Sequence, residues 1–136
     1  MRLVNIYDYP EQTRLDTLWE LLKERKPHTS ISHKKMPSRE NHEQFVEGKP
    51  YAVWYFICPD ENLDMIYGSI YLTNQREIGI QMFEKCQGYG GGTKAVKELM
   101  NIHKGPYFAN ISPKNEASMQ FFEGLGFKHV QNTFRL

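Results

Sequence analysis

The sequence predicts an α+β fold in which a central, mostly antiparallel sheet is flanked by about four helices. Three runs of strongly strand-forming residues, 51–57, 65–72 and 77–83, are separated only by short turn-forming stretches. Such short connections join antiparallel neighbours, so the runs are expected to form a meander. Helical spacing of apolar residues occurs both before and after this meander. The 136 residues fit one domain, 1–136, with a core of its own.

Before the meander, we expect one strand and two helices. Residues 3–7 alternate between apolar and polar and are typical of a strand. Apolar residues then recur at the spacing i, i+3, i+4 and i+7, which predicts an amphipathic helix: Leu15, Leu18, Trp19 and Leu22. Pro10 suits the first turn of that helix and Pro27 stops it. Ser38 is placed to cap a second, short helix that ends at Gly48.

After the meander, the sequence predicts two more helices and two more strand segments. A glycine-rich loop leads into residues with helical spacing: Ala95, Val96, Leu99, Met100 and His103. Residues 107–112 are expected to form a strand, and Asn115 is placed to cap a last helix that ends at Gly126. The final residues, 127–136, are predicted to form a strand or a pair of strands.

Composition narrows the function classes. The chain carries 17 basic and 16 acidic side chains, a formal net charge of +1, which argues against binding nucleic acid or anionic membranes through bulk charge. No apolar run approaches the ~20 residues of a membrane span, and the N-terminus has no apolar signal core. The two cysteines, Cys58 and Cys86, have neither a disulfide nor a zinc spacing, so no metal is expected. We expect a soluble, cytoplasmic protein.

The stretch "EIGIQMFEKCQGYGGGTKAVKELM", residues 77–100, places several glycines between a predicted strand and a predicted helix. The first N–H groups of a helix lack intrahelical partners and carry partial positive charge, and glycine lets a ligand approach the main chain. A phosphate site made of main chain is therefore predicted. A P-loop is excluded because Thr93 precedes Lys94, and a dinucleotide fingerprint is excluded because Thr93 occupies its third glycine position.

The loop and a second segment together resemble the GNAT superfamily of N-acyltransferases. Gln87, Gly90 and Gly92 give the pattern Q-x-x-G-x-G of its acyl-CoA loop, although the loop taken alone is also compatible with a flexible turn. The segment "NISPKNEASMQFFEGLGFK" resembles its other signature through these residues: Asn115, Ser118, Phe122, Gly126 and Phe127. The resemblance covers essentially the whole chain. It implies the acyl-CoA N-acyltransferase fold, with the sheet splayed open between 77–83 and 107–112 and acetyl-CoA in the opening.

This resemblance implies an acetyl-CoA-dependent N-acetyltransferase that acts by direct transfer on a primary amine of a small-molecule acceptor. A protein or peptide N-acetyltransferase and a non-catalytic CoA-binding module are the alternatives. The main chain of the loop would hold the diphosphate, and the preceding strand would pair with the pantetheine arm. The implied cofactor-binding residues are Gln81, Met82, Phe83, Gln87, Gly88, Tyr89, Gly90, Gly91, Gly92, Thr93, Asn115 and Phe122. A monomer or homodimer with no nucleic-acid or membrane partner is expected.

The catalytic residues follow from the chemistry that the resemblance implies. An amine with a pKa near 10.4 is mostly protonated at neutral pH, so a base is needed, and Glu77 at the start of the strand is our candidate. Many members carry a tyrosine as general acid where this chain has Phe122, which has no proton to donate. Ser118 is the candidate acid, or only a small residue beside the cofactor. His33 and His42 lie in the expected acceptor-side region and are alternative bases.

Overall fold

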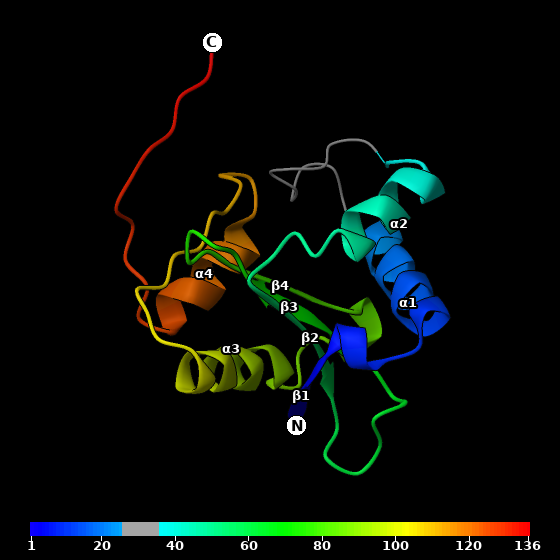
Figure 1. Cartoon of the computed structure of the whole chain (residues 1–136). Coiled ribbons are helices and arrows are strands. Elements are labelled where there is room, and N and C mark those ends of the chain that lie inside the picture. The colour runs from blue at the N-terminus through cyan, green and yellow to red at the C-terminus, as the bar shows by residue number, and fades with distance from the viewer. Residues whose placement is uncertain (26–35) are drawn as a thin grey trace.

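The computed structural model describes residues 1–25 and 36–136 (Figure 1). Four α-helices and four strands form within these residues, which confirms the predicted α+β class. In chain order, the elements are β1 Arg2–Asn5, the 3-10 turn η1 Ile6–Asp8, α1 Glu11–Glu24, α2 Arg39–Glu47, β2 Val53–Cys58, β3 Gly68–Leu72, β4 Ile78–Met82, the 3-10 turn η3 Glu84–Cys86, α3 Gly91–Ile102 and α4 Glu116–Gly124.

The sheet has the strand order β1-β2-β3-β4, and every neighbouring pair is antiparallel. The predicted meander of three strands is thus confirmed, and β1 adds to it beside β2. Val53 lies opposite Leu72, and Leu72 lies opposite Ile78, so the three meander strands stay in register.

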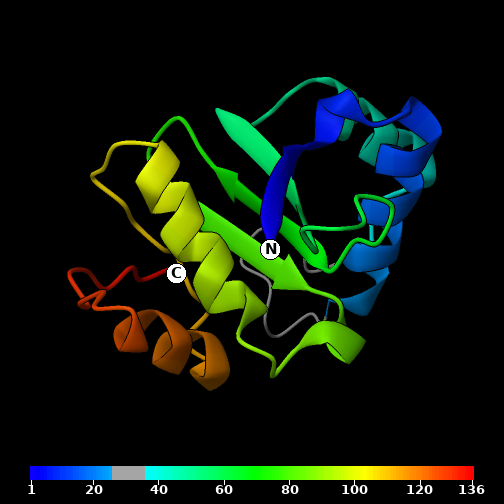
Figure 2. The ribbon, with the colours of Figure 1, turned by 90° about the horizontal axis from the view of Figure 1, so that it is seen from below.

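Hydrophobic side chains pack on both faces of the sheet. Alternate residues of β2 point to opposite faces, as a strand requires. Trp54, Phe56 and Cys58 join α1 and α2 in one buried cluster, whereas Ile57 joins α3 and α4 in the other. Figure 2 shows α3 crossing one side of the sheet while α1 lies beyond the other.

The predicted helix boundaries are set by capping side chains. The hydroxyl of Ser38 accepts a hydrogen bond from the N–H of Asn41 at 3.1 Å and opens α2. The Asn115 side chain accepts one from the N–H of Ser118 at 3.1 Å and opens α4. Gly126, with φ of 97°, takes the left-handed conformation just past α4. These caps agree with the sequence prediction.

Residues 107–112 do not form the predicted strand. One parallel bridge joins Glu77 to Phe108, with the N–H of Ile78 donating to the carbonyl of Phe108 at 2.7 Å. The N–H of Phe108 donates to the carbonyl of Arg76 at 2.8 Å. The chain then leaves β4 and turns toward α4, so pairing stops after one bridge. The predicted splay therefore begins at the first residues of β4.

Residues 127–136 were predicted to form strand and do not. Val130 and Phe134 are 79% and 90% exposed, and the segment extends away from the body of the molecule in Figure 1. A strand needs a paired edge, and no segment of the described residues pairs with this one. Only Phe127, at its beginning, packs against the core.

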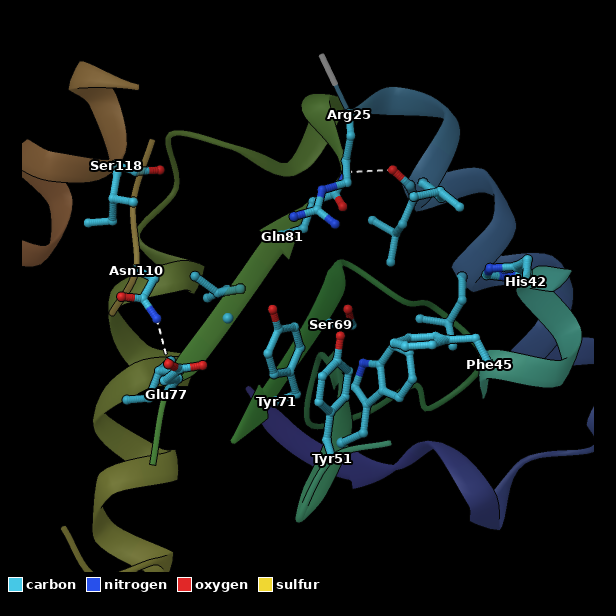
Figure 3. Close-up of a pocket in the computed structure, with 18 of the residues that line it drawn as sticks. Arg25, His42, Phe45, Tyr51, Ser69, Tyr71, Glu77, Gln81, Asn110 and Ser118 are labelled. Carbon is cyan, nitrogen blue, oxygen red and sulfur yellow. Dashed lines mark hydrogen bonds between the residues drawn. The ribbon is translucent and has the colours of Figure 1, made fainter. Parts of the chain in front are cut away.

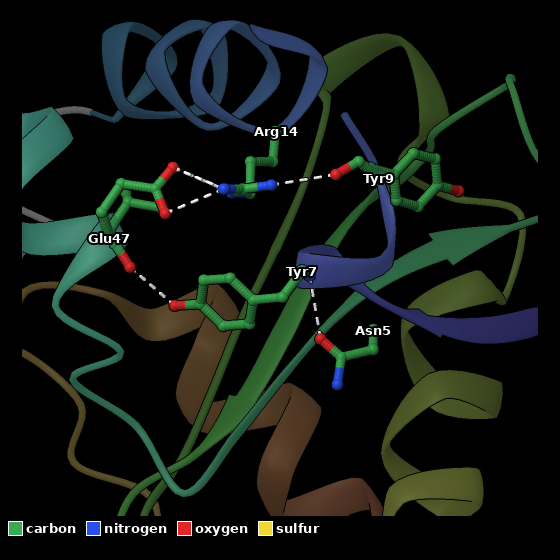
Figure 4. A network of polar contacts seen from close by, with 6 residues as sticks. Asn5, Tyr7, Tyr9, Arg14 and Glu47 are labelled. Atoms are coloured by element: carbon green, nitrogen blue, oxygen red, sulfur yellow. Dashed lines mark hydrogen bonds and ion pairs between the residues drawn. The ribbon is translucent and has the colours of Figure 1, made fainter. Parts of the chain in front are cut away.

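A polar network joins α1, α2 and η1 (Figure 4). The Arg14 guanidinium binds the Glu47 carboxylate at 2.7 and 2.9 Å and also donates to the Tyr9 carbonyl. The Tyr7 hydroxyl donates to the carbonyl of Val46 at 2.7 Å. Burial, together with the Glu47 carboxylate, raises the pKa of Tyr7 to about 12, so the phenol remains a donor at neutral pH. This network fixes the position of α2, which forms one wall of the cavity described next.

Candidate functional site

A cavity of about 440 Å³ lies between α1 and α2 on one side and α4 on the other, with β3 and β4 as its floor (Figure 3). Its lining combines residues that the sequence assigned to catalysis with residues assigned to the cofactor. Five of them meet here: Glu77, Gln81, Asn115, Ser118 and Phe122. These residues are up to 45 positions apart in the sequence and come from β4, the residue before it, the N-cap of α4 and α4 itself.

Glu77 is held by a neighbour on the other side of the splay. The side-chain amide of Asn110 donates to one Glu77 carboxylate oxygen at 2.6 Å (Figure 3). The Glu77 N–H donates to the Thr73 hydroxyl at 3.0 Å, so main chain and side chain are both positioned. A carboxylate has a second oxygen with acceptor capacity, which suits a proton acceptor. Asn110 is not among the sequence-predicted site residues, although it lies within the predicted strand 107–112 beside the expected splay.

The residues of β4 divide into two sets by the direction of their main-chain groups. The N–H of Phe83 donates to the Tyr67 carbonyl, and the Glu77 carbonyl accepts from Thr73, so odd-numbered residues bond to β3. Antiparallel pairing alternates, so the N–H groups of Ile80 and Met82 point to the open edge. These two groups, rather than those of Gln81 and Phe83, are available to pair with an extended ligand. Sequence alone did not single out Ile80.

Gln81, Met82 and Phe83, the residues predicted to lie along the pantetheine arm, place their side chains in different surroundings. The Gln81 amide donates to the Leu21 carbonyl at the end of α1 and lines the cavity. Met82 and Phe83 are half-buried beside the two hydrophobic clusters and do not line the cavity.

The glycine-rich loop has the open main chain that a phosphate site requires. Gly88 and Gly90 have φ values of 86° and 82°, and a Cβ at either position would meet no atom within 4 Å. Gly90 is the N-cap of α3, a helix of 12 residues, and makes no side-chain cap. The N–H groups of the first turn, which ends with Thr93, have no intrahelical acceptors. An anion would therefore meet both the free amides and the helix dipole.

The loop and the start of α3 lie close to Met82 of β4 and Phe121 of α4. A Cβ on Gly91 would lie 3.1 Å from the Met82 side chain, and one on Gly92 would lie 3.4 Å from the Phe121 ring. The Gln87 side chain donates to the carbonyl of Met82 at 3.3 Å. Tyr89 is 83% exposed and projects from the loop. The loop thus lies at the end of the open β4 edge, but outside the lining of the cavity.

Aromatic residues form the other wall of the cavity; their alternation along the meander predicts that some face the pocket, but not which ones. Tyr51 and Tyr71 stack at 3.8 Å between ring centroids with an angle of 3° between ring planes. Trp54 meets Tyr51 edge-on at 4.7 Å. Burial, with a smaller effect from the Tyr71 phenol, raises the pKa of Tyr51. Tyr55 lies on the opposite face of the sheet, where its hydroxyl lies 2.8 Å from Nε2 of His103.

The remaining candidates are placed as follows. His42 is 6% exposed, lines the cavity and packs against the Trp19 ring with centroids 5.2 Å apart. His33 lies outside the described residues. Within residues 1–25 and 36–136, no group of three or more His, Cys, Asp or Glu side chains is arranged to hold a metal ion. No helix in those same two ranges has the length and apolar content needed to cross a membrane.

The fold is similar to that of several solved structures. A protein from Streptococcus mutans UA159 matches 94% of this chain and 84% of its own at 18% identity, with a TM-score of 0.68. A domain from Methanocaldococcus jannaschii matches 97% and 89% at 22% identity, with a TM-score of 0.68. A Trypanosoma brucei acetyltransferase matches 99% and 96% at 21% identity, with a TM-score of 0.62.

These likenesses concern the fold, and they place at least one acetyltransferase among the proteins that share it. No protein-family model matches the sequence. No curated protein matches it either.

Proposed function

We propose that this protein is an acetyl-CoA-dependent N-acetyltransferase of the GNAT type that transfers the acetyl group directly to a primary amine of a small acceptor. The observation that carries the proposal is the presence of two sets of open main-chain donors, one on the free edge of β4 and one from the glycine loop into the first turn of α3. Ile80 and Met82 face a splayed edge, and Gly90 opens a helix with no side-chain cap. The shared fold with an acetyltransferase supports the same function.

The residues of this chain fit acetyl-CoA in two places. The N–H groups from Gly88 to Thr93 would hold the diphosphate, because they combine free donors with the positive end of α3. The open edge of β4 would hold the pantetheine arm by strand-like hydrogen bonds, and one of its N–H groups would polarise the thioester carbonyl. Bound acetyl-CoA supplies an activated acetyl group.

Glu77 is the proposed base. It lies in the cavity wall at the start of β4, and Asn110 orients its carboxylate. The acceptor amine must lose a proton to become a nucleophile, and a carboxylate held in a cavity can accept that proton directly or through a water molecule. The aromatic side of the cavity would hold the rest of the acceptor.

Protonating the departing CoA thiolate is less demanding than removing a proton from the amine, because a thiol has a pKa of ~8.5. Phe122 is 5% exposed and has no proton to give. Ser118, one helical turn earlier, lines the same cavity and is the proposed donor. Ser118→Ala tests it: a proton donor predicts a slower rate, whereas a merely small residue predicts an unchanged rate.

A second function remains a candidate because of Phe122. A protein that binds CoA without catalysis would need the loop and the open edge but no acid. The deciding experiment mixes the protein with acetyl-CoA and a broad panel of amines and follows thiol release. Turnover of any amine supports the transferase, and tight CoA binding without any turnover supports the binding module.

A further inference from the structure

We propose that the acceptor carries its amine on a flat, apolar body, such as an aromatic ring, that lies against the wall formed by Tyr51, Trp54 and Tyr71. This inference rests on the proposed acetyl transfer, because it names the class of acceptor for the same cavity. Figure 3 shows Tyr51 and Tyr71 between Glu77 on one side and Phe45 on the other.

The rings of the wall pack against one another in the structure. Tyr51 stacks on Tyr71 at 3.8 Å, and Trp54 and Phe45 meet Tyr51 edge-on at 4.7 and 5.8 Å. Trp54 is only 8% exposed, so its ring supports the two tyrosines from behind. A preformed aromatic surface binds flat rings by offset or edge-on contact with little loss of side-chain freedom.

The charges of the cavity oppose a polyamine acceptor. Among the described lining residues, Glu77 is the one acid and Arg25 the one guanidinium. A polyamine has several cationic centres and needs several carboxylates. On the wall opposite α4, Leu18, Leu21 and Leu22 add apolar surface beside the rings, and Asn41 and His42 add polar groups. Glucosamine therefore serves as the polar competitor in the test below.

Gly79 positions the wall. It lies opposite Tyr71 in the register of β3 and β4 and lines the cavity. A Cβ at this position would overlap the Tyr71 ring, so the ring lies across β4 only because residue 79 is glycine. A ring that covers a cross-strand glycine in this way sets the floor of the acceptor site. Gly79 is therefore a positioning residue for acceptor selection.

The test compares kcat/KM for four acceptors with acetyl-CoA: 2-phenylethylamine, spermidine, glucosamine and a short peptide with a free N-terminus. We expect 2-phenylethylamine to exceed each of the others about 10-fold or more, because one aromatic contact and its buried area together reach that factor. If spermidine or glucosamine has the highest kcat/KM, this inference is overturned and the proposed transferase stands. If the peptide has the highest kcat/KM, this inference is overturned together with the small-molecule acceptor. If none of the four reacts, this inference is overturned, and the proposed function is overturned as well only if the broad amine panel also gives no turnover although CoA binds.

Variants of the wall give a second readout. Tyr71→Leu should raise the KM for 2-phenylethylamine roughly 10-fold and leave the KM for acetyl-CoA unchanged. Gly79→Ala, which displaces the same ring without removing it, should shift the acceptor KM in the same direction. Tyr55→Leu is the matched control, because it removes a tyrosine from the opposite face of the sheet. Equal kinetic losses for 2-phenylethylamine and spermidine, or a change only in kcat, would overturn the proposed role of the wall.

Discussion

One side of the cavity is formed by packed side chains, and the other side by main-chain N–H groups that lack hydrogen-bond partners within the described residues. On the α1 and α2 side, side chains interlock: Arg14 binds Glu47, and Tyr51 stacks on Tyr71. On the β4 side and in the following loop, the main chain is left open, with Gly88 and Gly90 in left-handed conformations. A wall of side chains can select among acceptors, whereas open main chain binds a group common to every reaction. Gly90→Val and Arg14→Ala below are therefore each expected to affect one side and spare the other.

The largest effect is expected from Glu77→Gln. Glutamine keeps the shape and can still accept the Asn110 hydrogen bond, but it cannot take a proton, so kcat should fall by roughly 10²–10³. Steady-state kinetics with the best amine measures this, and CoA binding should be unaltered. Glu84→Gln is the control, because Glu84 is an exposed carboxylate near the loop. An unchanged kcat in Glu77→Gln would remove Glu77 as the base.

The next effect concerns the loop. Thermal melting with CoA at about 100 times its dissociation constant should add roughly 2.7 kcal/mol of stability to the native chain. Gly90→Val should abolish this gain, because φ of 82° is strained for valine and its side chain would block approach to the amides. Gly124→Val, at the end of α4, is the control that should retain the gain. A full CoA shift in Gly90→Val contradicts the loop assignment.

A smaller effect, on the free energy of unfolding, is expected from the Arg14–Glu47 network on the α1 and α2 side. Arg14→Ala should lower the free energy of unfolding by about 2 kcal/mol, because it removes charge-assisted bonds to Glu47 and leaves that carboxylate unpaired. Denaturant unfolding measures this loss, and the CoA-induced shift should persist. Lys23→Ala, from the exposed pair with Glu20, should cost less than ~0.5 kcal/mol. Equal costs would show that the buried network adds no stability.

The smallest effect concerns pH. Burial, and secondarily Arg76, lowers the pKa of His103 below its ordinary 6.5. The unfolded chain then takes up the proton first, so this contribution to stability is complete above about pH 6.5 and declines as pH falls below it. His103→Gln should make unfolding less sensitive to pH between about 7.5 and 5.5. If His103→Gln leaves the pH dependence of unfolding unchanged, His103 does not contribute to that dependence.

Much of the fold could be predicted because its signals are local. The caps at Ser38 and Asn115 and the short turns of the meander depend on neighbours in sequence, and the structure has them where expected. The strands predicted at residues 107–112 and 127–136 do not form, because strand formation is not a local property. A strand exists only if another segment pairs with it, and strand-forming composition does not reveal the partner.

The candidate site likewise contains some residues that local sequence patterns predict and others that they do not. The loop pattern and the Asn115 helix can be read along the chain, and Glu77, Ser118 and Phe122 do meet in one cavity. The face on which each aromatic residue lies depends on register, so Tyr51 and Tyr71 could not be separated from Tyr55 in advance. The role of Gly79 depends on a ring from another strand, and a sequence pattern cannot show that contact.

Acetyl transfer by this chain requires the main chain of the loop and of β4 to bind CoA, and isothermal titration calorimetry of the folded protein with CoA and acetyl-CoA measures that binding. Saturable, one-site binding of both ligands, abolished by Gly90→Val, is expected. A well-folded protein that gives neither heat nor a thermal shift with either ligand would contradict the proposed acetyl transfer.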